Sequence, residues 1–219
     1  MRPQSAKVFG VFGFILITSL LTAQPVSRSI RIGNRIVIEA SRDVGYQEKT
    51  WRNDHPIFDY YRALAKNKGV YSSRGWQDAY CGFAVYAWHR QSGVSPNLSP
   101  GRAINWSVHP SKILLGPFAK TADIAKIQPG WVIGFKFESN HVGIVEQVYP
   151  LYCQTIEANT STSNSIGHYK TKNDGVIRKI RPHRVARWAT DWRNSPTSDT
   201  LPVQALRRKY AAKLTASSK

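Results

Sequence analysis

The chain has little cysteine: two residues, Cys81 and Cys153, among 219. A pair of cysteines excludes a network of several disulfides, but in an oxidising compartment it is first interpreted as one disulfide. Composition alone does not separate that interpretation from two free thiols. The spacing of these cysteines and of the six histidines does not match a zinc site, so we expect neither a metal nor another cofactor.

Acidic residues are also scarce. Only 13 Asp and Glu stand against 31 Lys and Arg, a formal net charge of +18, and the segment from Arg178 to Lys219 holds eleven basic and two acidic residues, a net +9. Such a surface favours polyanions as partners, although a basic stretch at a chain end is most often a solvated tail. For an exported protein these partners are anionic polymers or lipid head groups of the cell envelope, with nucleic acid as a weaker candidate.

The sequence lacks an apolar run of the roughly 20 residues that a transmembrane helix needs. The apolar stretch from Val8 to Leu21 is shorter, contains glycine and hydroxyl residues, follows the basic residues Arg2 and Lys7, and precedes the small residue Ala23. This order is typical of a secretory signal, so we expect residues 1–23 to be removed and the mature chain to be secreted or periplasmic, without an integral membrane segment. The remaining length, about 195 residues, suits one domain, which we expect to be a monomer.

Helical periodicity comes first along the chain and strand alternation second. We expect helices in residues 33–50, 54–69 and 78–93, a long loop with at most short helices over 97–127, and strands in residues 131–137, 141–148, 153–159 and 175–181. Helices that precede an antiparallel sheet indicate the α+β class. The chain after Pro182 has weak periodicity, and we expect it to lie draped over the surface.

Cys81 lies in the segment YCGFAVYAWHRQSG, where Asp78 is the expected N-cap and Cys81 falls in the first turn of the helix. The positive end of the helix dipole favours thiolate over thiol, as a nucleophile requires. The glycine that follows, Gly82, would let a substrate carbonyl approach the backbone. The alternative is a small buried residue that packs the helix onto the core.

His141 opens a strand after a turn, and alternation places it with Gly143 and Val145 on one face. The strand that should neighbour it carries two polar residues two positions apart, Glu157 and Asn159. Either side chain could orient the imidazole and fix its tautomer, as the third member of a triad does. Taken alone, a histidine and a polar strand residue are usually satisfied surface groups, but the other five histidines have no such setting.

Several short motifs follow one another between residues 36 and 181: VGYQEKTWRND, YCGFAVYAWHRQSG, PGWVIGFKF, NHVGIVEQV, TIEANTS and DGVIRKIR. In their sequence, order and spacing they resemble the CHAP family, the cysteine, histidine-dependent amidohydrolases/peptidases. The resemblance implies a papain-like α+β fold over residues 24–183, with N-terminal helices packed on a C-terminal antiparallel sheet, and leaves residues 184–219 as a basic C-terminal extension. It also implies Cys81 as nucleophile, His141 as base and Glu157, with Asn159 close by, as the polar third residue.

The expected function is the hydrolysis of amide bonds in peptidoglycan, as an N-acetylmuramoyl-L-alanine amidase or an endopeptidase. The oxyanion would be held by the Cys81 amide and a second donor, either Gln77 or a main-chain group. One alternative is a basic secreted domain, closed by a disulfide, that binds anionic envelope polymer without cutting it. The other is an exported nucleic-acid binder. Strand geometry argues against a Cys81–Cys153 bridge. If Glu157 lies beside His141 and His141 beside Cys81, then Cys153, roughly 13 Å of extended strand from Glu157, lies too far from Cys81, because a disulfide needs Cα atoms within about 7 Å. We therefore expect two free thiols, with Cys81 the more reactive.

Overall fold

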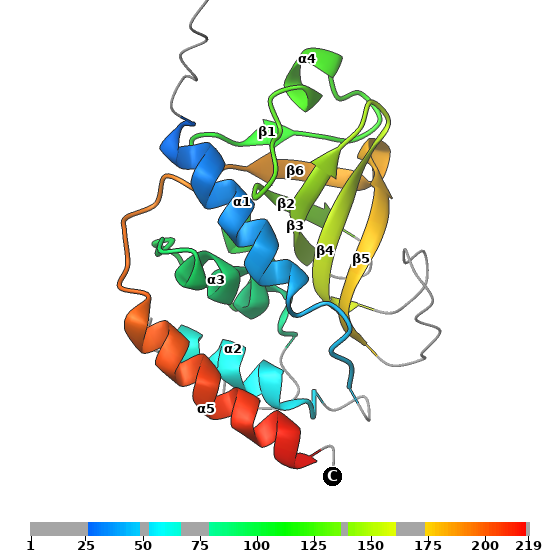
Figure 1. The fold of residues 1–219 in the computed structure, drawn as a ribbon. Coiled ribbons are helices and arrows are strands. Elements are labelled where there is room, and N and C mark those ends of the chain that lie inside the picture. The colour runs from blue at the N-terminus through cyan, green and yellow to red at the C-terminus, as the bar shows by residue number, and fades with distance from the viewer. Residues whose placement is uncertain (1–25, 49–52, 67–78, 137–139, 161–173, 218–219) are drawn as a thin grey trace, which may run out of the picture.

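The computed structural model describes residues 26–48, 53–66, 79–136, 140–160 and 174–217, and the expected signal segment 1–23 lies outside them. The described chain combines α-helices with a six-stranded antiparallel sheet, so it belongs to the α+β class (Figure 1). Among the described residues, no helix is both long and apolar enough to cross a membrane. The elements are α1 (Arg28–Ser41), α2 (Pro56–Lys66), α3 (Cys81–Gln91), the 3-10 helix η2 (Ala103–Ser107), β1 (Ile113–Leu114), α4 (Thr121–Ile124), β2 (Val132–Lys136), β3 (Asn140–Val148), β4 (Tyr152–Thr160), β5 (Gly175–Pro182), the 3-10 helix η3 (His183–Val185), β6 (Ala186–Thr190) and α5 (Leu201–Ser217).

Helix α1 both begins and ends earlier than the expected range 33–50. Its start is fixed by Ser27, whose hydroxyl accepts a hydrogen bond from the main-chain amide three residues later (3.4 Å). Ile36 and Ala40, four residues apart, are buried on the side that contacts α3 and β3. After the helix the chain turns at Gly45, whose φ of 99° favours glycine, and runs toward β5.

Helix α3 is buried on almost every side, because α1 and α2 contact it and the strands β3 and β4 lie against it. This position explains why its sequence has so few polar residues. The N-cap is Tyr80 and not the expected Asp78, which lies outside the described residues. The Tyr80 side chain makes no capping hydrogen bond, so the N–H groups of the first turn are left to other partners.

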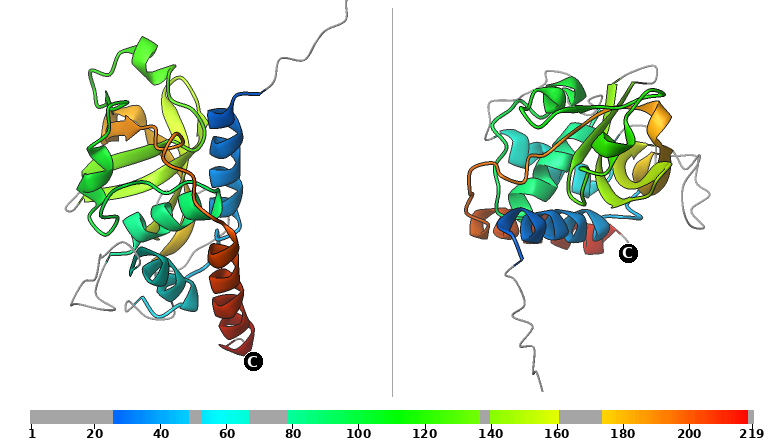
Figure 2. Two further views of the ribbon diagram at one scale, coloured as in Figure 1. Left: turned by 90° about the vertical axis from the view of Figure 1, so that its left-hand side faces the viewer. Right: turned by 90° about the horizontal axis from the view of Figure 1, so that it is seen from above.

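The strand order in the sheet is β1-β6-β2-β3-β4-β5, and each neighbouring pair is antiparallel. Helices α1 and α3 cover one face of this sheet (Figures 1 and 2). That face carries the larger hydrophobic core, to which Val142, Ile144 and Ile156 contribute. The opposite face carries a smaller core that includes Ile133 and Val145. Successive residues of β3 therefore point into two different cores.

Two register shifts interrupt the alternation expected for β3 and β4. The first lies directly after Val145, so that Val148 packs in the same small core as Val145 and not, as strict alternation requires, with Val142. The second lies at Asn159, which is an extra residue in β4 and has a φ of 59°. A bulge turns a side chain away from the face that alternation assigns to it. Asn159 and Glu157 therefore do not share a face in the way the spacing indicated.

The expectation that the chain after Pro182 is draped over the surface is wrong. Strand β6 pairs with both β1 and β2 inside the sheet, and α5 packs against α2. Trp188 of β6 lies over Gly134 and joins the larger core, as does Trp192. Four of the five residues of β6 are buried, so the strand lacks the polar alternation by which a half-exposed strand is identified.

A buried carboxylate connects the helices. Asp43 is fully buried and accepts hydrogen bonds from the Tyr61 hydroxyl (2.7 Å), the Trp88 indole (2.8 Å) and the Arg207 guanidinium of α5. Burial raises the pKa of Asp43, and the charge of Arg207 opposes that rise. Helix α5 thus supplies the counter-charge for a carboxylate that follows α1.

Candidate active site

Cys81 is the first residue of α3, and only 3% of its surface is exposed. Burial alone would raise the pKa of this thiol. A hydrogen bond with His141, the charge of that imidazole, and the amides of Val142 and Gly82, which donate to the sulfur, outweigh burial and lower the pKa of Cys81 below its ordinary value. The surroundings of the sulfur therefore favour the thiolate.

His141 lies on β3 and connects the sulfur to a carboxylate. Its Nε2 atom is 3.0 Å from Glu157 Oε2, which leaves Nδ1 to face Cys81. Burial opposes the imidazolium, but the hydrogen bonds with Cys81 and Glu157 and the charges of both groups raise the pKa of His141 to about 9. The lowered pKa of Cys81 and the raised pKa of His141 together favour a thiolate–imidazolium pair over a neutral thiol and imidazole.

Glu157 of β4 is fully buried, and both of its oxygens accept two hydrogen bonds. Oε2 accepts from His141 and from Arg181 Nη2 (2.5 Å), while Oε1 accepts from Arg181 Nε (2.7 Å) and from Thr155 Oγ1 (2.6 Å). Burial opposes ionisation, but the contacts with Arg181 and His141 hold the pKa of Glu157 far below its ordinary value. Arg181 and His141 thus favour the ionised carboxylate, which the imidazole of His141 faces.

Sequence analysis did not identify Arg181 or Thr155 as site residues. A signal exists in the strand GVIRKIR, where alternation places Lys179 and Arg181 on one face and Arg178 on the other. Which of these faces meets Glu157 depends on the register of β5 against β4, in which Cys153 pairs with Arg181 and Thr155 with Lys179. The pattern of one strand does not contain that register.

Two glycines at the site are required by close packing. Gly143 pairs with Glu157 across β3 and β4, and a Cβ atom at Gly143 would lie 2.6 Å from Glu157 Cγ. The missing side chain lets Glu157 lie over β3 beside His141. A Cβ atom at Gly82 would lie 2.0 Å from the Pro100 carbonyl oxygen, so Gly82 is needed to pack α3 against a loop, whereas we expected it to serve substrate approach.

The structure brings Cys81, His141 and Glu157 together and leaves Asn159 aside. The group that bonds His141 Nε2 is Glu157, whereas Asn159 lies at the register shift of β4 with a φ of 59°. Gln77, which we considered as a donor to the oxyanion, lies outside the described residues. The expected choice between Glu157 and Asn159 as the partner of His141 is therefore decided by geometry in favour of Glu157.

A second cysteine–histidine contact lies at the other end of β4. Cys153 Sγ is 3.7 Å from His183 Nδ1, and His183 Nε2 is 2.8 Å from the Tyr149 carbonyl oxygen. Burial raises the pKa of Cys153 to about 12, so this side chain is a neutral thiol at neutral pH. Cys153 and Cys81 are both free of disulfides.

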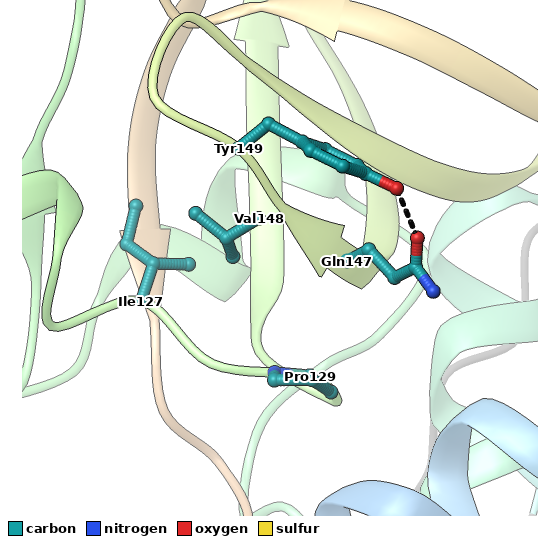
Figure 3. Close-up of a pocket in the computed structure, with 5 residues that line it drawn as sticks. All are labelled: Ile127, Pro129, Gln147, Val148 and Tyr149. Carbon is teal, nitrogen blue, oxygen red and sulfur yellow. Dashed lines mark hydrogen bonds between the residues drawn. The ribbon is translucent and has the colours of Figure 1, made fainter.

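The far end of β3 also borders an open pocket of about 460 Å³ (Figure 3). The Tyr149 hydroxyl donates to the Gln147 side chain at this pocket. None of the lining residues is charged, and the pocket lies at the opposite end of β3 from His141. Its lining consists of Ile127, Pro129, Gln147, Val148 and Tyr149. Within the described residues, no group of three or more His, Cys, Asp or Glu side chains is arranged to hold a metal ion.

Comparison with known proteins adds nothing to this geometry: no family model, no curated protein and no solved structure matches the chain.

Proposed function

We propose that this protein is a papain-like cysteine amidohydrolase of the CHAP type that cuts amide bonds in peptidoglycan. Cys81 is the nucleophile, His141 is the acid and base, and Glu157 orients His141. One observation carries the proposal: a thiol in the first turn of a buried helix is bonded to an imidazole whose other nitrogen lies 3.0 Å from a buried carboxylate. Cysteine hydrolases depend on a nucleophile, a base and an orienting group in this order.

The reaction follows from the ionisation of the two groups. The Cys81 thiolate attacks the carbonyl carbon of the amide, and the His141 imidazolium gives its proton to the leaving amine, which releases one product and leaves an acyl-enzyme. The neutral imidazole then takes a proton from water as the water attacks the thioester. Collapse of that intermediate restores the thiolate, and the imidazolium keeps the proton for the next cycle.

The oxyanion of each tetrahedral intermediate requires hydrogen-bond donors. The main-chain amide of Cys81 belongs to the uncapped first turn of α3, where N–H groups have no partner within the helix. The positive end of the helix dipole lies at the same point and stabilises negative charge. This amide is therefore our candidate for one of the two donors.

The basic surface supports an anionic polymer as the substrate. Helices α1 and α5 lie along the same side of the molecule in both views of Figure 2. Both helices carry exposed basic side chains, and peptidoglycan with its attached anionic polymers offers matching charge. The exposed basic residues of α1, its C-cap and α5 are Arg28, Arg31, Arg35, Arg42, Arg208, Lys209 and Lys213. The expected export signal at residues 1–23 supports the same partner.

Digestion of purified peptidoglycan tests the proposal. The mature chain should clear the suspension, and a Cys81→Ala variant with an unchanged circular dichroism spectrum should not. Mass spectrometry of the released fragments then identifies the bond: free stem peptides indicate an amidase, and glycan fragments that keep shortened peptides indicate an endopeptidase. A Cys81→Ala variant that retains more than a tenth of the activity would place the nucleophile elsewhere. Binding to the polymer without any cleavage would favour the non-catalytic alternative.

A further inference from the structure

The carboxylate of Glu157 accepts hydrogen bonds from the guanidinium of Arg181 as well as from the imidazole of His141. Arg181 donates to both carboxylate oxygens, through Nε at 2.7 Å and Nη2 at 2.5 Å, and it is itself buried, with 9% of its surface exposed. Its guanidinium carbon lies 5.1 Å from the centre of the Phe135 ring, which stacks on His141. Arg181 is therefore fixed by two groups that also fix His141.

The charges of this cluster balance only when Arg181 is counted. Thiolate, imidazolium and carboxylate together carry one net negative charge, and the guanidinium cancels it. An uncompensated charge in a buried site is expensive, and the site would bind a proton to remove it. A proton on Glu157 weakens the attraction that holds the imidazolium, and a proton on Cys81 removes the nucleophile directly. Either event lowers the amount of thiolate–imidazolium pair at neutral pH.

We propose that Arg181 is a positioning residue of the active site, which acts through Glu157 to keep His141 oriented and the Cys81–His141 pair ionised; this inference rests on the proposed function. It turns a three-residue site into a chain of four side chains from α3, β3, β4 and β5. Thr155 supports the same carboxylate oxygen as Arg181 Nε. Two further charged groups face this cluster, Lys179 of β5 and Asp174 directly before that strand.

The same strand provides a matched control. Arg178 also forms a two-bond contact with a glutamate, through Nε to both oxygens of Glu146 (3.0 and 2.9 Å). It lies on the opposite face of β5, where its Nη2 atom donates to Ser41 of α1. Loss of Arg178 therefore removes an arginine–glutamate pair from the sheet without touching the cluster of Cys81.

The test measures the rate at which iodoacetamide alkylates Cys81 as a function of pH, in the full mature chain. We expect Arg181→Met to slow alkylation at pH 6 to 7 by about tenfold, because an adjacent guanidinium typically changes the ionisation of a carboxylate by an order of magnitude or more. Arg181→Lys should recover part of this loss, since it keeps the charge without the two-bond geometry. Arg178→Met should leave the profile of Cys81 unchanged, whatever it does to stability.

A double variant, Glu157→Gln with Arg181→Met, shows whether Arg181 acts through Glu157. Alkylation of Cys81 in the double variant should be no slower than in Glu157→Gln alone, because the effect of Arg181 is lost once the Glu157 carboxylate is gone. An Arg181→Met profile that equals the wild type in folded protein would overturn the proposal, as would full additivity in the double variant. Alkylation needs no substrate, so these results stand apart from peptidoglycan hydrolysis. A wild type that cleaves no peptidoglycan refutes the proposed substrate, whereas an unchanged Arg181→Met profile refutes only the role of Arg181.

Discussion

The molecule contains two buried cysteine–histidine contacts with opposite chemistry. At one end of the β3–β4 pair, Cys81 bonds His141, the pKa of the thiol is lowered and the pKa of the imidazole is raised to about 9. At the other end, Cys153 lies 3.7 Å from His183, and burial raises the pKa of its thiol to about 12. Contact between a thiol and an imidazole therefore does not by itself produce a nucleophile.

The two contacts differ in the partner of the second ring nitrogen of each histidine and in the groups around each sulfur. The Nε2 atom of His141 bonds the carboxylate of Glu157, whereas the Nε2 atom of His183 bonds the neutral Tyr149 carbonyl oxygen. A carboxylate favours the imidazolium far more than a carbonyl does. Cys81 also begins a helix and accepts hydrogen bonds from two amides, while Cys153 lies within a strand among apolar side chains. At Cys81 these interactions outweigh the rise in thiol pKa that burial causes, whereas at Cys153 burial alone sets the direction of the shift.

The largest expected effect is the difference in reactivity between the two thiols. With its pKa near 12, only about one Cys153 in 10⁵ is a thiolate at pH 7, so iodoacetamide should alkylate Cys81 faster by at least about a thousandfold. Peptide mass spectrometry after timed quenching measures both rates in one sample. Cys81→Ala should remove the fast phase alone. Equal rates in folded protein, or a Cys81–Cys153 disulfide in active material, would show that the two thiols do not differ in reactivity.

A second test asks whether the difference in reactivity between Cys81 and Cys153 depends only on their own neighbours or also on the packing of the helices. Arg207→Met leaves Asp43 buried without its counter-charge, so the free energy of unfolding should fall by about 3 kcal/mol. Urea denaturation measures this loss. Arg208→Met, an exposed neighbour on the same helix, should change stability by no more than about 0.5 kcal/mol. Alkylation of the remaining folded Arg207→Met protein should still select Cys81, because Asp43 does not contact either cysteine–histidine pair. Loss of that selectivity would show that the pairs depend on the helical layer as a whole.

The pH dependence of hydrolysis tests the carboxylate behind His141. The pKa of His141 is raised to about 9, so the proton that leaves with the amine is present below this pH and lost above it. The value of kcat/KM should therefore fall on an alkaline limb near pH 9. In Glu157→Gln the carboxylate that raises this pKa is gone, so the limb should move to lower pH, and activity at pH 8 should drop by about tenfold or more.

Glu146→Gln is the control for that experiment, because Glu146 also bonds an arginine of β5 but faces α1. Its alkaline limb should stay where the wild type has it. A Glu157→Gln limb that does not move, in protein with a native circular dichroism spectrum, would mean that another group sets the protonation of His141.

The parts of the site that could be predicted from sequence are those that depend on one element at a time. The helical period ending at Gly93 placed Cys81 in a first turn, and strand alternation placed His141 and Glu157 on faces that meet. Asn159 was a candidate by the same alternation and lies aside, because a bulge adds a residue and turns the strand. Local spacing carries no information about a bulge.

The parts that could not be predicted depend on pairing between distant segments. Arg181 reaches Glu157 only through the register of β5 on β4, which is fixed by the whole sheet. Strand β6 is buried on both faces and has no alternation, and Arg207 meets Asp43 across more than 160 residues of chain. The basic residues after Arg184 led us to expect a solvated tail, but the charge of a side chain does not reveal whether the backbone that carries it is packed.

The smallest effect is expected for Cys153→Ser, a substitution in the Cys153–His183 contact. The serine hydroxyl can still donate to His183 Nδ1, whose tautomer is set by the Tyr149 carbonyl oxygen, so the contact survives in a weaker and more polar form. The cost is one hydroxyl among apolar residues, about 1 kcal/mol of stability. Peptidoglycan hydrolysis should stay within about twofold of the wild type, because His183 lies at the far end of the strand pair from His141.

Cys81→Ser, the same substitution at the other pair, should lose nearly all activity, since a hydroxyl is not ionised by this imidazole at neutral pH. Turbidity assays on equal amounts of folded protein compare the two variants directly. Comparable losses in both would mean that Cys153 and His183 take part in the chemistry, and the contrast between a reactive and an inert pair would have to be abandoned.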